Sequence, residues 1–155
     1  MSLNEEVEIL KKIPLFQNFE PAKLKLLAFA SERIHFEAGQ TVCRQGDPGD
    51  AAYVIISGEA DILVDGPDGP IQVATVRDHG FIGEIAILID VPRTATIRAH
   101  TELVALQIKK DLFFRMVREY PGVAVEVMRE LAQRLERTTS ELTRVRGELN
   151  RLTAN

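Results

Sequence analysis

The sequence has a single cysteine, and none of its apolar runs approaches the ~20 residues needed to cross a bilayer. One thiol excludes an internal disulfide and an iron–sulfur cluster, and it is typical of a reducing compartment. The N-terminus lacks the basic and then apolar segment of a secretory signal, so we expect a cytoplasmic protein without membrane insertion. The net charge of −4 comes from 19 Lys and Arg against 23 Asp and Glu, which argues against direct nucleic-acid binding.

Motifs for metal binding or covalent catalysis are also missing. His35, His79 and His100 are far apart along the chain, and no His or Cys spacing supplies the clustered ligands of a metal site. Cys43 lies within a strand pattern and is expected to be a small core side chain. We therefore expect no metal, no cofactor and no catalytic activity.

What the chain does have is the length and composition of one globular domain. Its 155 residues are 45% hydrophobic and 27% charged, and a typical domain has about 100–200 residues. Residues 4–32 have helical patterning, with Asn4 as the expected N-cap of a first helix. A second helix is expected to begin at Glu20-Pro21, because proline is suited to the first helical position.

Residues 33–109 have the pattern of short strands separated by glycine-containing turns. No part of this stretch is long enough for several helical crossovers, so the pattern favours an antiparallel sandwich or barrel over a parallel sheet. The expected strands are 41–43, 53–56, 62–64, 71–73, 94–97 and 103–106.

Residues 110–155 have helical patterning again. We expect Asp111 to cap a short helix that ends near Tyr120, followed by one long helix over residues 123–152. Val125 and Met128 are expected to pack on the strand region. Further along, apolar residues repeat at alternating spacings of three and four, which is a heptad seam. The seam consists of Met128, Leu131, Leu135, Thr138, Leu142, Val145, Leu149 and Leu152.

The seam predicts a homodimer, because a helix that extends beyond a small domain usually pairs with a copy of itself. Residues 110–155 carry nine Lys and Arg and seven Asp and Glu, a balance of +2 that leaves −6 for the rest. Mixed charges beside a seam suit pairing between helices, whereas a DNA-binding basic region would be far more one-sided.

The run over residues 80–96, GFIGEIAILIDVPRTAT, contains the candidate ligand-binding groups. It predicts a turn, a short helix that opens at Gly83-Glu84, a loop stopped by Pro92 and then a strand. Free amides at a helix start, together with the guanidinium of Arg93, are suited to an anion. The Glu84 carboxylate would repel a phosphate but would accept hydrogen bonds from hydroxyl groups, so a ribose phosphate suits both. A structural ion pair between Glu84 and Arg93 is the alternative.

This run resembles the phosphate-binding cassette of cyclic nucleotide-binding domains, and the final helix is similar to the dimer helix of the catabolite-activator branch. The resemblance implies a mainly β fold: an antiparallel double-stranded, jelly-roll-like β-roll with flanking helices. The N-terminal helices would span 4–32, the β-roll 33–109 with its cassette at 80–96, and a lid with the dimerisation helix 110–155. Glycine-marked turns that match the family's β-roll are Gly39, Gly46-Asp47 and Ser57-Gly58.

The resemblance also implies a role for individual residues. Glu84 would accept from the ribose 2′-hydroxyl and Arg93 would pair with the cyclic phosphate. Thr94 would bond a phosphate oxygen or the base. Backbone around four residues would hold the sugar-phosphate, and three residues of the long helix would lie at the base. These are Gly83, Ile85, Ala86 and Ala95 for the backbone, and Arg134, Thr138 and Thr139 for the base.

These residues favour cAMP as the ligand, with cGMP close behind because a threonine after the cassette arginine recurs in guanine-binding members. The expected function is a sensor module that transmits occupancy through its last helix. One alternative is an interaction or oligomerisation module that no longer binds nucleotide. Another is the sensor fragment of a longer transcription regulator, channel or kinase. The 155 residues leave no segment for an output domain, and no DNA-binding domain is expected.

Overall fold

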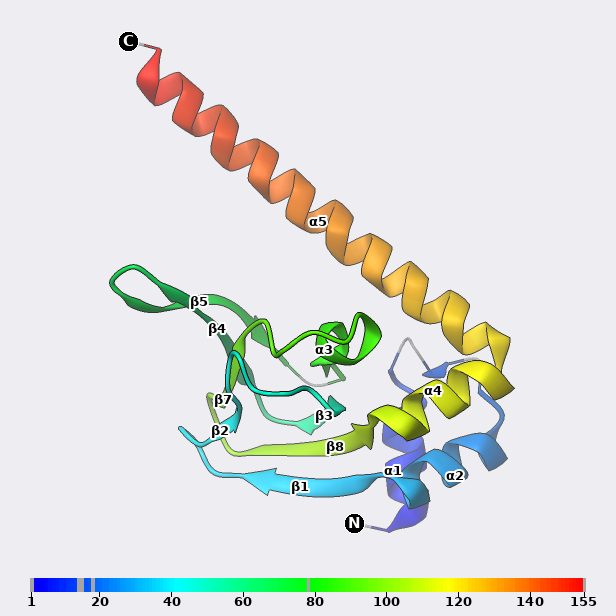
Figure 1. Ribbon diagram of the computed structural model, residues 1–155. Coiled ribbons are helices and arrows are strands. Elements are labelled where there is room, and N and C mark those ends of the chain that lie inside the picture. Colours follow the sequence, from blue (N-terminus) through cyan, green and yellow to red (C-terminus); the bar gives the residue numbers. More distant parts are fainter. Residues whose placement is uncertain (1, 14–15, 18, 78, 155) are drawn as a thin grey trace.

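The fold is a β-roll with helices gathered at one end and one long helix that projects away from it (Figure 1). This computed structural model describes residues 2–13, 16–17, 19–77 and 79–154. The side chains of residues 84 and 85 lie outside the described part, so the expectations for Glu84 and Ile85 are tested only for their backbone.

Two short helices open the chain. α1 spans Leu3–Leu10, and its N-cap is Ser2, whose hydroxyl accepts from the Glu5 amide at 3.2 Å. The expectation of Asn4 as the cap is wrong, because the serine two residues earlier provides the hydroxyl and Asn4 lies inside the helix. α2 spans Pro21–Ala30 with its proline in the first turn, as expected.

Within the described ranges, eight strands form two antiparallel four-stranded sheets. The first has the order β1-β8-β3-β6 and the second the order β2-β7-β4-β5, which confirms the predicted β-roll. Two short strands, β1 and β6, were not expected, and β7 begins two residues later than the expected strand at 94–97. The strands are β1 (Glu32–Phe36), β2 (Thr41–Cys43), β3 (Ala51–Ser57), β4 (Ala60–Gly66), β5 (Gly69–Val76), β6 (Phe81–Ile82), β7 (Thr96–Ala99) and β8 (Leu103–Lys109).

Strand β3 joins the two hydrophobic cores, because it is buried on both faces. Ala52, Val54 and Ile56 face the core shared with the helices, whereas Tyr53 and Ile55 face the core between the sheets. The alternation follows from the two-residue period of a strand. A continuous apolar run is therefore needed here, and the sequence supplies one.

Three helices follow the early strands. α3 (Glu84–Leu88) opens at the expected place, and α4 spans Lys110–Glu119. The expectation that Asp111 caps α4 is wrong, since the N-cap is Lys109 with no side-chain cap bond and Asp111 lies in the first turn. α5 spans Pro121–Thr153 and begins two residues earlier than expected, with proline in its first turn.

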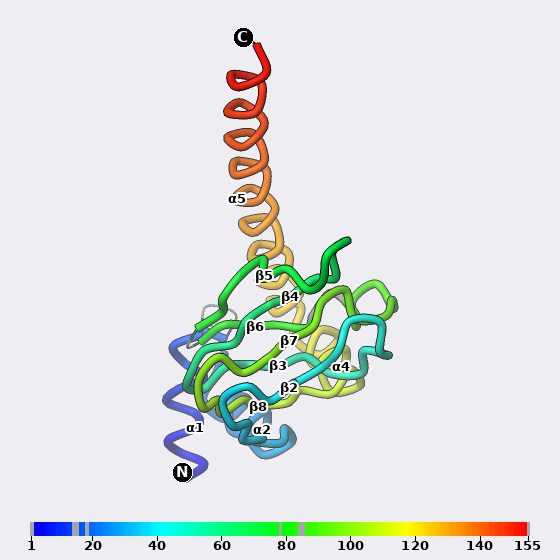
Figure 2. The backbone as a smooth tube through the Cα atoms, turned by 90° about the vertical axis from the view of Figure 1, so that its left-hand side faces the viewer, coloured from blue at the N-terminus to red at the C-terminus, as the bar shows by residue number. Residues whose placement is uncertain are grey.

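The apolar side chains of helix α5 that pack on the domain lie in its first third, up to Leu131. Val123 and Val127 are buried, while Val125 and Met128 are exposed, so the expected packing of the latter pair is wrong. The four-residue spacing places Val123 and Val127 on one face, and that face meets the helical core. The distal half of α5 extends past the rest of the molecule (Figure 2). No helix in the described ranges is long and apolar enough to cross a membrane.

Candidate functional site

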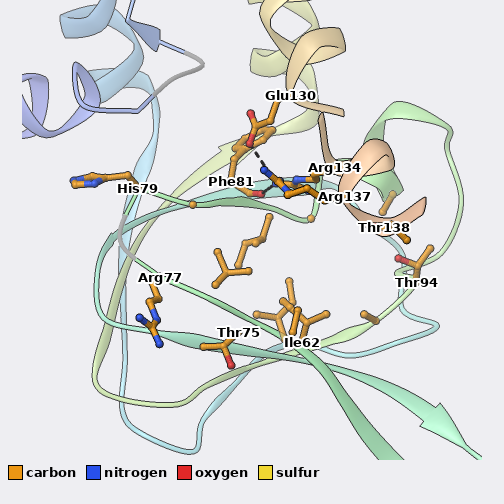
Figure 3. Close-up of a pocket in the computed structure, with 18 of the residues that line it drawn as sticks. Ile62, Thr75, Arg77, His79, Phe81, Thr94, Glu130, Arg134, Arg137 and Thr138 are labelled. Carbon is orange, nitrogen blue, oxygen red and sulfur yellow. Dashed lines mark hydrogen bonds and ion pairs between the residues drawn. The ribbon is translucent and has the colours of Figure 1, made fainter. Parts of the chain in front are cut away.

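A cavity of about 1010 Å³ lies between the β-roll and α5 (Figure 3). One wall comes from the segment that resembles the cassette, a second from β4 and β5, and the third from α5. Arg134 and Arg137 border it from α5, and Thr94 and Thr138 lie at one end of the view. Segments far apart in the sequence therefore meet at one concave site.

Most of the residues predicted for the site line this cavity. Five come from the cassette segment and two from α5: Gly83, Ala86, Arg93, Thr94, Ala95, Arg134 and Thr138. Thr139 is exposed on α5 outside the lining, where its carbonyl accepts from the Thr143 hydroxyl at 2.9 Å. The side chains of Glu84 and Ile85 lie outside the described part, as does an ion pair between Glu84 and Arg93.

The backbone of Arg93 is fixed by a turn of the preceding strand region. Its amide donates to the Asp47 carbonyl at 2.8 Å, and its carbonyl accepts from the Gly46 amide at 2.8 Å. Gln45 is held nearby, because its amide donates to the Thr96 hydroxyl at 2.9 Å. These bonds position the arginine at the cavity wall before any ligand arrives.

The guanidinium of Arg93 is buried, with only 5% of the residue exposed. It donates to the Ala51 carbonyl at 2.6 Å and to the Gly83 carbonyl at 3.1 Å. Among the described side chains it forms no ion pair with a carboxylate. A guanidinium has five N–H donors, so the site holds a buried cation with donors to spare at a cavity wall.

Gly83 is required by the closeness of this arginine. Its φ of 83° lies in the left-handed region, which glycine adopts without a steric penalty. A Cβ at this position would lie 2.6 Å from Nη1 of Arg93. Any side chain at residue 83 would displace the guanidinium, so the glycine and the arginine form one structural unit.

Cys43 of β2 lies close to this unit but is not reactive. Burial raises the pKa of the Cys43 thiol, and the positive charge of Arg93 only partly opposes that effect. The thiol therefore stays protonated at neutral pH, in contrast to a nucleophilic cysteine. Within the described ranges, no three residues among His, Cys, Asp and Glu gather as metal ligands.

Arg134 connects α5 to the cassette segment. Its guanidinium donates to the carbonyl of Phe81, and it pairs with Glu130 at 3.4 Å (Figure 3). The ring of Phe81 stacks on Phe113 of α4, with centroids 6.0 Å apart. Phe81 therefore contacts both C-terminal helices, two residues before the glycine that contacts Arg93.

Part of the cavity lining was not predicted from the sequence. On α5, Glu130, Arg137 and Glu141 share the cavity-facing side with Arg134, and a helical spacing of three and four residues from Arg134 could have found them. On β5, Ala74 and Thr75 also line the cavity. No local signal identifies these two, because their placement depends on how β5 pairs with β4.

Three comparisons agree on the family of this chain. The profile of the cyclic nucleotide-binding domain matches residues 33–120. The CRP-like cAMP-activated global transcriptional regulator of Mycobacterium tuberculosis is 33% identical over 136 residues, 87% of this chain and 61% of that protein. The cAMP-dependent protein kinase regulatory subunit of Emericella nidulans is 35% identical over 108 residues, 70% of this chain and 26% of that protein.

A solved structure has the same architecture. The crystal structure of Thermus thermophilus catabolite activator protein superposes with a TM-score of 0.77 and 26% identity, covering 85% of this chain and 62% of that one. The chain thus spans about three fifths of the two bacterial regulators and about a quarter of the kinase subunit.

Proposed function

This chain belongs to the cyclic nucleotide-binding domain family, and on that premise we propose that it is a regulatory sensor that binds cAMP in the cavity below α5. It is proposed to have no catalytic activity of its own and to act in the cytoplasm. It is further proposed to neither bind nucleic acid directly nor insert into a membrane. The printed names of two relatives, a cAMP-activated regulator and a cAMP-dependent kinase subunit, support cAMP as the ligand.

The buried guanidinium of Arg93 carries this proposal. Burying a cation without an anionic partner costs free energy, and an anion at the cavity wall would offset that cost. The cyclic phosphate would supply the anion, with Arg93 as a donor on one side and the backbone of Gly83 to Ala86 on the other. Glu84 would accept from the ribose 2′-hydroxyl, and Ile85 and Ala95 would hold the sugar-phosphate.

The base would lie against α5. Thr94 would contact a phosphate oxygen or the base, and Arg134 and Thr138 would approach the base from the helix. Thr139 would contact the base after a rotation of the helix or from a second copy, because it lies outside the cavity lining. Occupancy would then alter how α5 sits on the cavity.

The exposed seam of α5 supports a homodimer as the form that transmits this change. Leu135, Leu142 and Leu149 are 68%, 54% and 56% exposed, at the spacing expected of a coiled coil. A second candidate function follows from the same seam: an oligomerisation module that binds no nucleotide. The chain could also serve as the sensor part of a longer regulator, channel or kinase.

Titration with nucleotide tests the proposal. Millimolar cAMP is expected to raise the melting temperature of the protein by mass action, whereas 5′-AMP is not. Isothermal titration calorimetry would measure the affinity for cAMP in the wild type and in Arg93→Ala. Loss of the buried partner of the phosphate is expected to cost about 3–5 kcal/mol, hence an affinity at least ~100-fold lower.

Arg98→Ala is the matched control, because Arg98 is an exposed arginine of the neighbouring strand β7 and does not line the cavity. It should bind cAMP as the wild type does. Unchanged affinity in Arg93→Ala would place the anion elsewhere. No response of the wild type to either cAMP or cGMP would leave the oligomerisation module as the function.

A further inference from the structure

A second cavity, of about 50 Å³, lies between α2 and α4 and shares no described lining residue with the first. The α2 residues that line it have the spacing i, i+3, i+4, i+7 and are Lys23, Leu26, Leu27 and Ala30. Helix α4 lines it at the same spacing over Leu112–Glu119. This is the spacing of one helix face, so two helix faces border a groove at the end of the domain where the helices gather (Figure 1).

Helix α2 has more apolar surface than its contacts with the domain bury. Its sequence, PAKLKLLAFA, contains no acidic residue, and its two lysines are its only charged residues. Leu24 and Leu27 are buried, but Leu26 is 52% exposed and Phe29 is 80% exposed. The outer face of a surface helix is usually polar, so exposed apolar side chains beside an apolar groove indicate a contact surface.

The charge at this groove is positive. Nζ of Lys23 lies 3.7 Å from the ring centroid of Tyr120, which also lines the groove. Neither Lys23 nor the exposed Lys25 forms an ion pair with a described carboxylate. On the opposite side, Arg115 and Glu119 pair with each other at 3.2 Å and add no net charge. The two lysines of α2 therefore determine the sign of charge that a partner must carry.

We propose that this groove binds an acidic amphipathic helix of a partner protein. A helix with apolar residues at i, i+3, i+4 and i+7 matches the spacing of the two faces that border the groove. Its carboxylates would lie opposite Lys23 and Lys25, and its apolar residues would cover Leu26 and Phe29. The proposal concerns a surface separate from the nucleotide cavity and does not depend on the ligand.

The size of the cavity suits one apolar side chain of such a helix. A water-sized group needs roughly 10–15 Å³, so a cavity of about 50 Å³ admits about four such groups. The side chain of leucine has four carbon atoms. Leu27 and Met116 are buried in the helical core and would contact this side chain from below. A leucine of the partner would therefore anchor the helix in the groove.

Charge disfavours a second copy of this chain as the occupant. In a two-fold contact the same surface patch meets itself, so Lys23 and Lys25 of both copies would come together. Helix α2 has no carboxylate to offset them. Like charges brought together at an interface suppress association. A partner with carboxylates at the matching positions meets no such repulsion.

Charge and shape also disfavour a bilayer. Basic segments bind anionic lipid, but residues 1–109 carry a net charge of −6. Glu5 is exposed on α1, the helix that packs with α2 in the same core. A concave groove bordered by two helices suits a protein side chain better than a flat lipid surface. A protein segment is therefore the occupant that the observations favour.

Fluorescence anisotropy with three labelled helical peptides tests the chemistry of the partner. The peptides share leucine at i, i+3, i+4 and i+7, and their flanking polar positions are glutamate in one, glutamine in another and lysine in the third. The glutamate peptide is expected to bind at least about tenfold more tightly than the lysine peptide. Phe29→Ser should weaken its binding at least about tenfold. Lys23→Glu with Lys25→Glu should reverse the preference between the two charged peptides.

Two variants outside the groove are the matched controls. Val73→Ser removes an exposed apolar side chain of β5, and Arg98→Glu reverses an exposed charge of β7. Both should bind the glutamate peptide as the wild type does. Equal affinity for the three peptides, binding of none of them, or an unchanged affinity in Phe29→Ser would overturn the proposal.

The other occupants predict different results for Phe29→Ser. If the wild type cosedimented with phosphatidylserine vesicles and Phe29→Ser did not, a bilayer would be the occupant. If Phe29→Ser lowered the sedimentation coefficient of the protein alone, a second copy would be the occupant. Either result would overturn the acidic helix.

Discussion

Asp61 on β4 is a buried carboxylate whose three partners come from β5 and from the residue that follows β7. With 3% of its surface exposed, it accepts from Gln72 Nε2 at 3.1 Å, from the Thr75 hydroxyl at 3.2 Å and lies 3.0 Å from Nδ1 of His100. Thr75 also lines the cavity. The carboxylate therefore holds β5, an edge strand of its sheet, against β4 at the rim of the site.

We expect Asp61→Asn to destabilise the fold by about 1–3 kcal/mol. An amide presents a donor where the carboxylate presents only acceptors, so the buried side chain at residue 61 loses part of its hydrogen bonding to Gln72, Thr75 and His100. Urea denaturation of the variant would measure the free energy of unfolding. Asp65→Asn, on the exposed part of the same strand, should change it by less than about 0.5 kcal/mol. Equal effects of the two substitutions would contradict a structural role for the Asp61 contacts.

At this scale the sequence predicts a residue well when its neighbours in the chain determine its role. The cassette segment supplies both Gly83 and Arg93, and the structure brings them into contact. The structural role of Asp61 was not predicted, because its partners Gln72 and Thr75 lie next to it only through the pairing of β4 with β5. That pairing contains a bulge between Ile62 and Leu63, which no local pattern announces.

The elements follow the sequence where hydrophobic periodicity is strong. α5 was expected over 123–152 and spans Pro121–Thr153, because its apolar spacing continues without a break. β1 was not predicted, because its own residues are largely polar. It forms a strand by pairing with β8, which lies more than sixty residues later in the sequence. β6 is only two residues long, which is too short for any period to appear.

The seam of α5 leads to a prediction about assembly. Exposed leucines at heptad spacing lose their contact with water only in a pair of helices, and each buried leucine stabilises that pair by about 2 kcal/mol. We expect the double substitution Leu142→Glu with Leu149→Glu to convert a dimer to a monomer in sedimentation velocity. Truncation after Arg137 should have the same effect, because it removes five of the eight seam residues.

Thr143→Glu with Asn150→Glu is the control for added charge. Both positions lie on α5 away from the seam and are exposed. This variant should sediment as the wild type does. If the truncated chain remained a dimer with an unchanged sedimentation coefficient, the interface would lie outside the seam.

In the whole molecule, α5 contributes to two surfaces, the cavity wall and the exposed seam. One face borders the cavity with Arg134 and Arg137 (Figure 3), and an adjacent face carries the exposed seam. Thr138 belongs to both, because it lines the cavity and lies three residues from Leu135 and four from Leu142. The sequence could predict the seam and the cassette separately. Their meeting at Thr138 depends on the angle at which α5 leaves α4, which has no signature in the sequence.

This shared position predicts that ligand binding and dimerisation are coupled. A ligand that changes how α5 lies on the cavity also changes the register in which two seams meet, so one process biases the other. Thermodynamic linkage requires reciprocity: if cAMP tightens the dimer by a given factor, dimerisation must tighten cAMP binding by the same factor. For a coupling of about 1–3 kcal/mol that factor is about 5- to 150-fold.

The two sides of the linkage can be measured independently. Sedimentation equilibrium with and without saturating cAMP gives the change in dimer affinity. Calorimetry on the wild type and on the Leu142→Glu, Leu149→Glu monomer gives the change in cAMP affinity. Equal factors above about fivefold are expected. A monomer that binds cAMP as tightly as the wild type, with a dimer constant that does not respond to cAMP, would show that the cavity and the seam of α5 act independently.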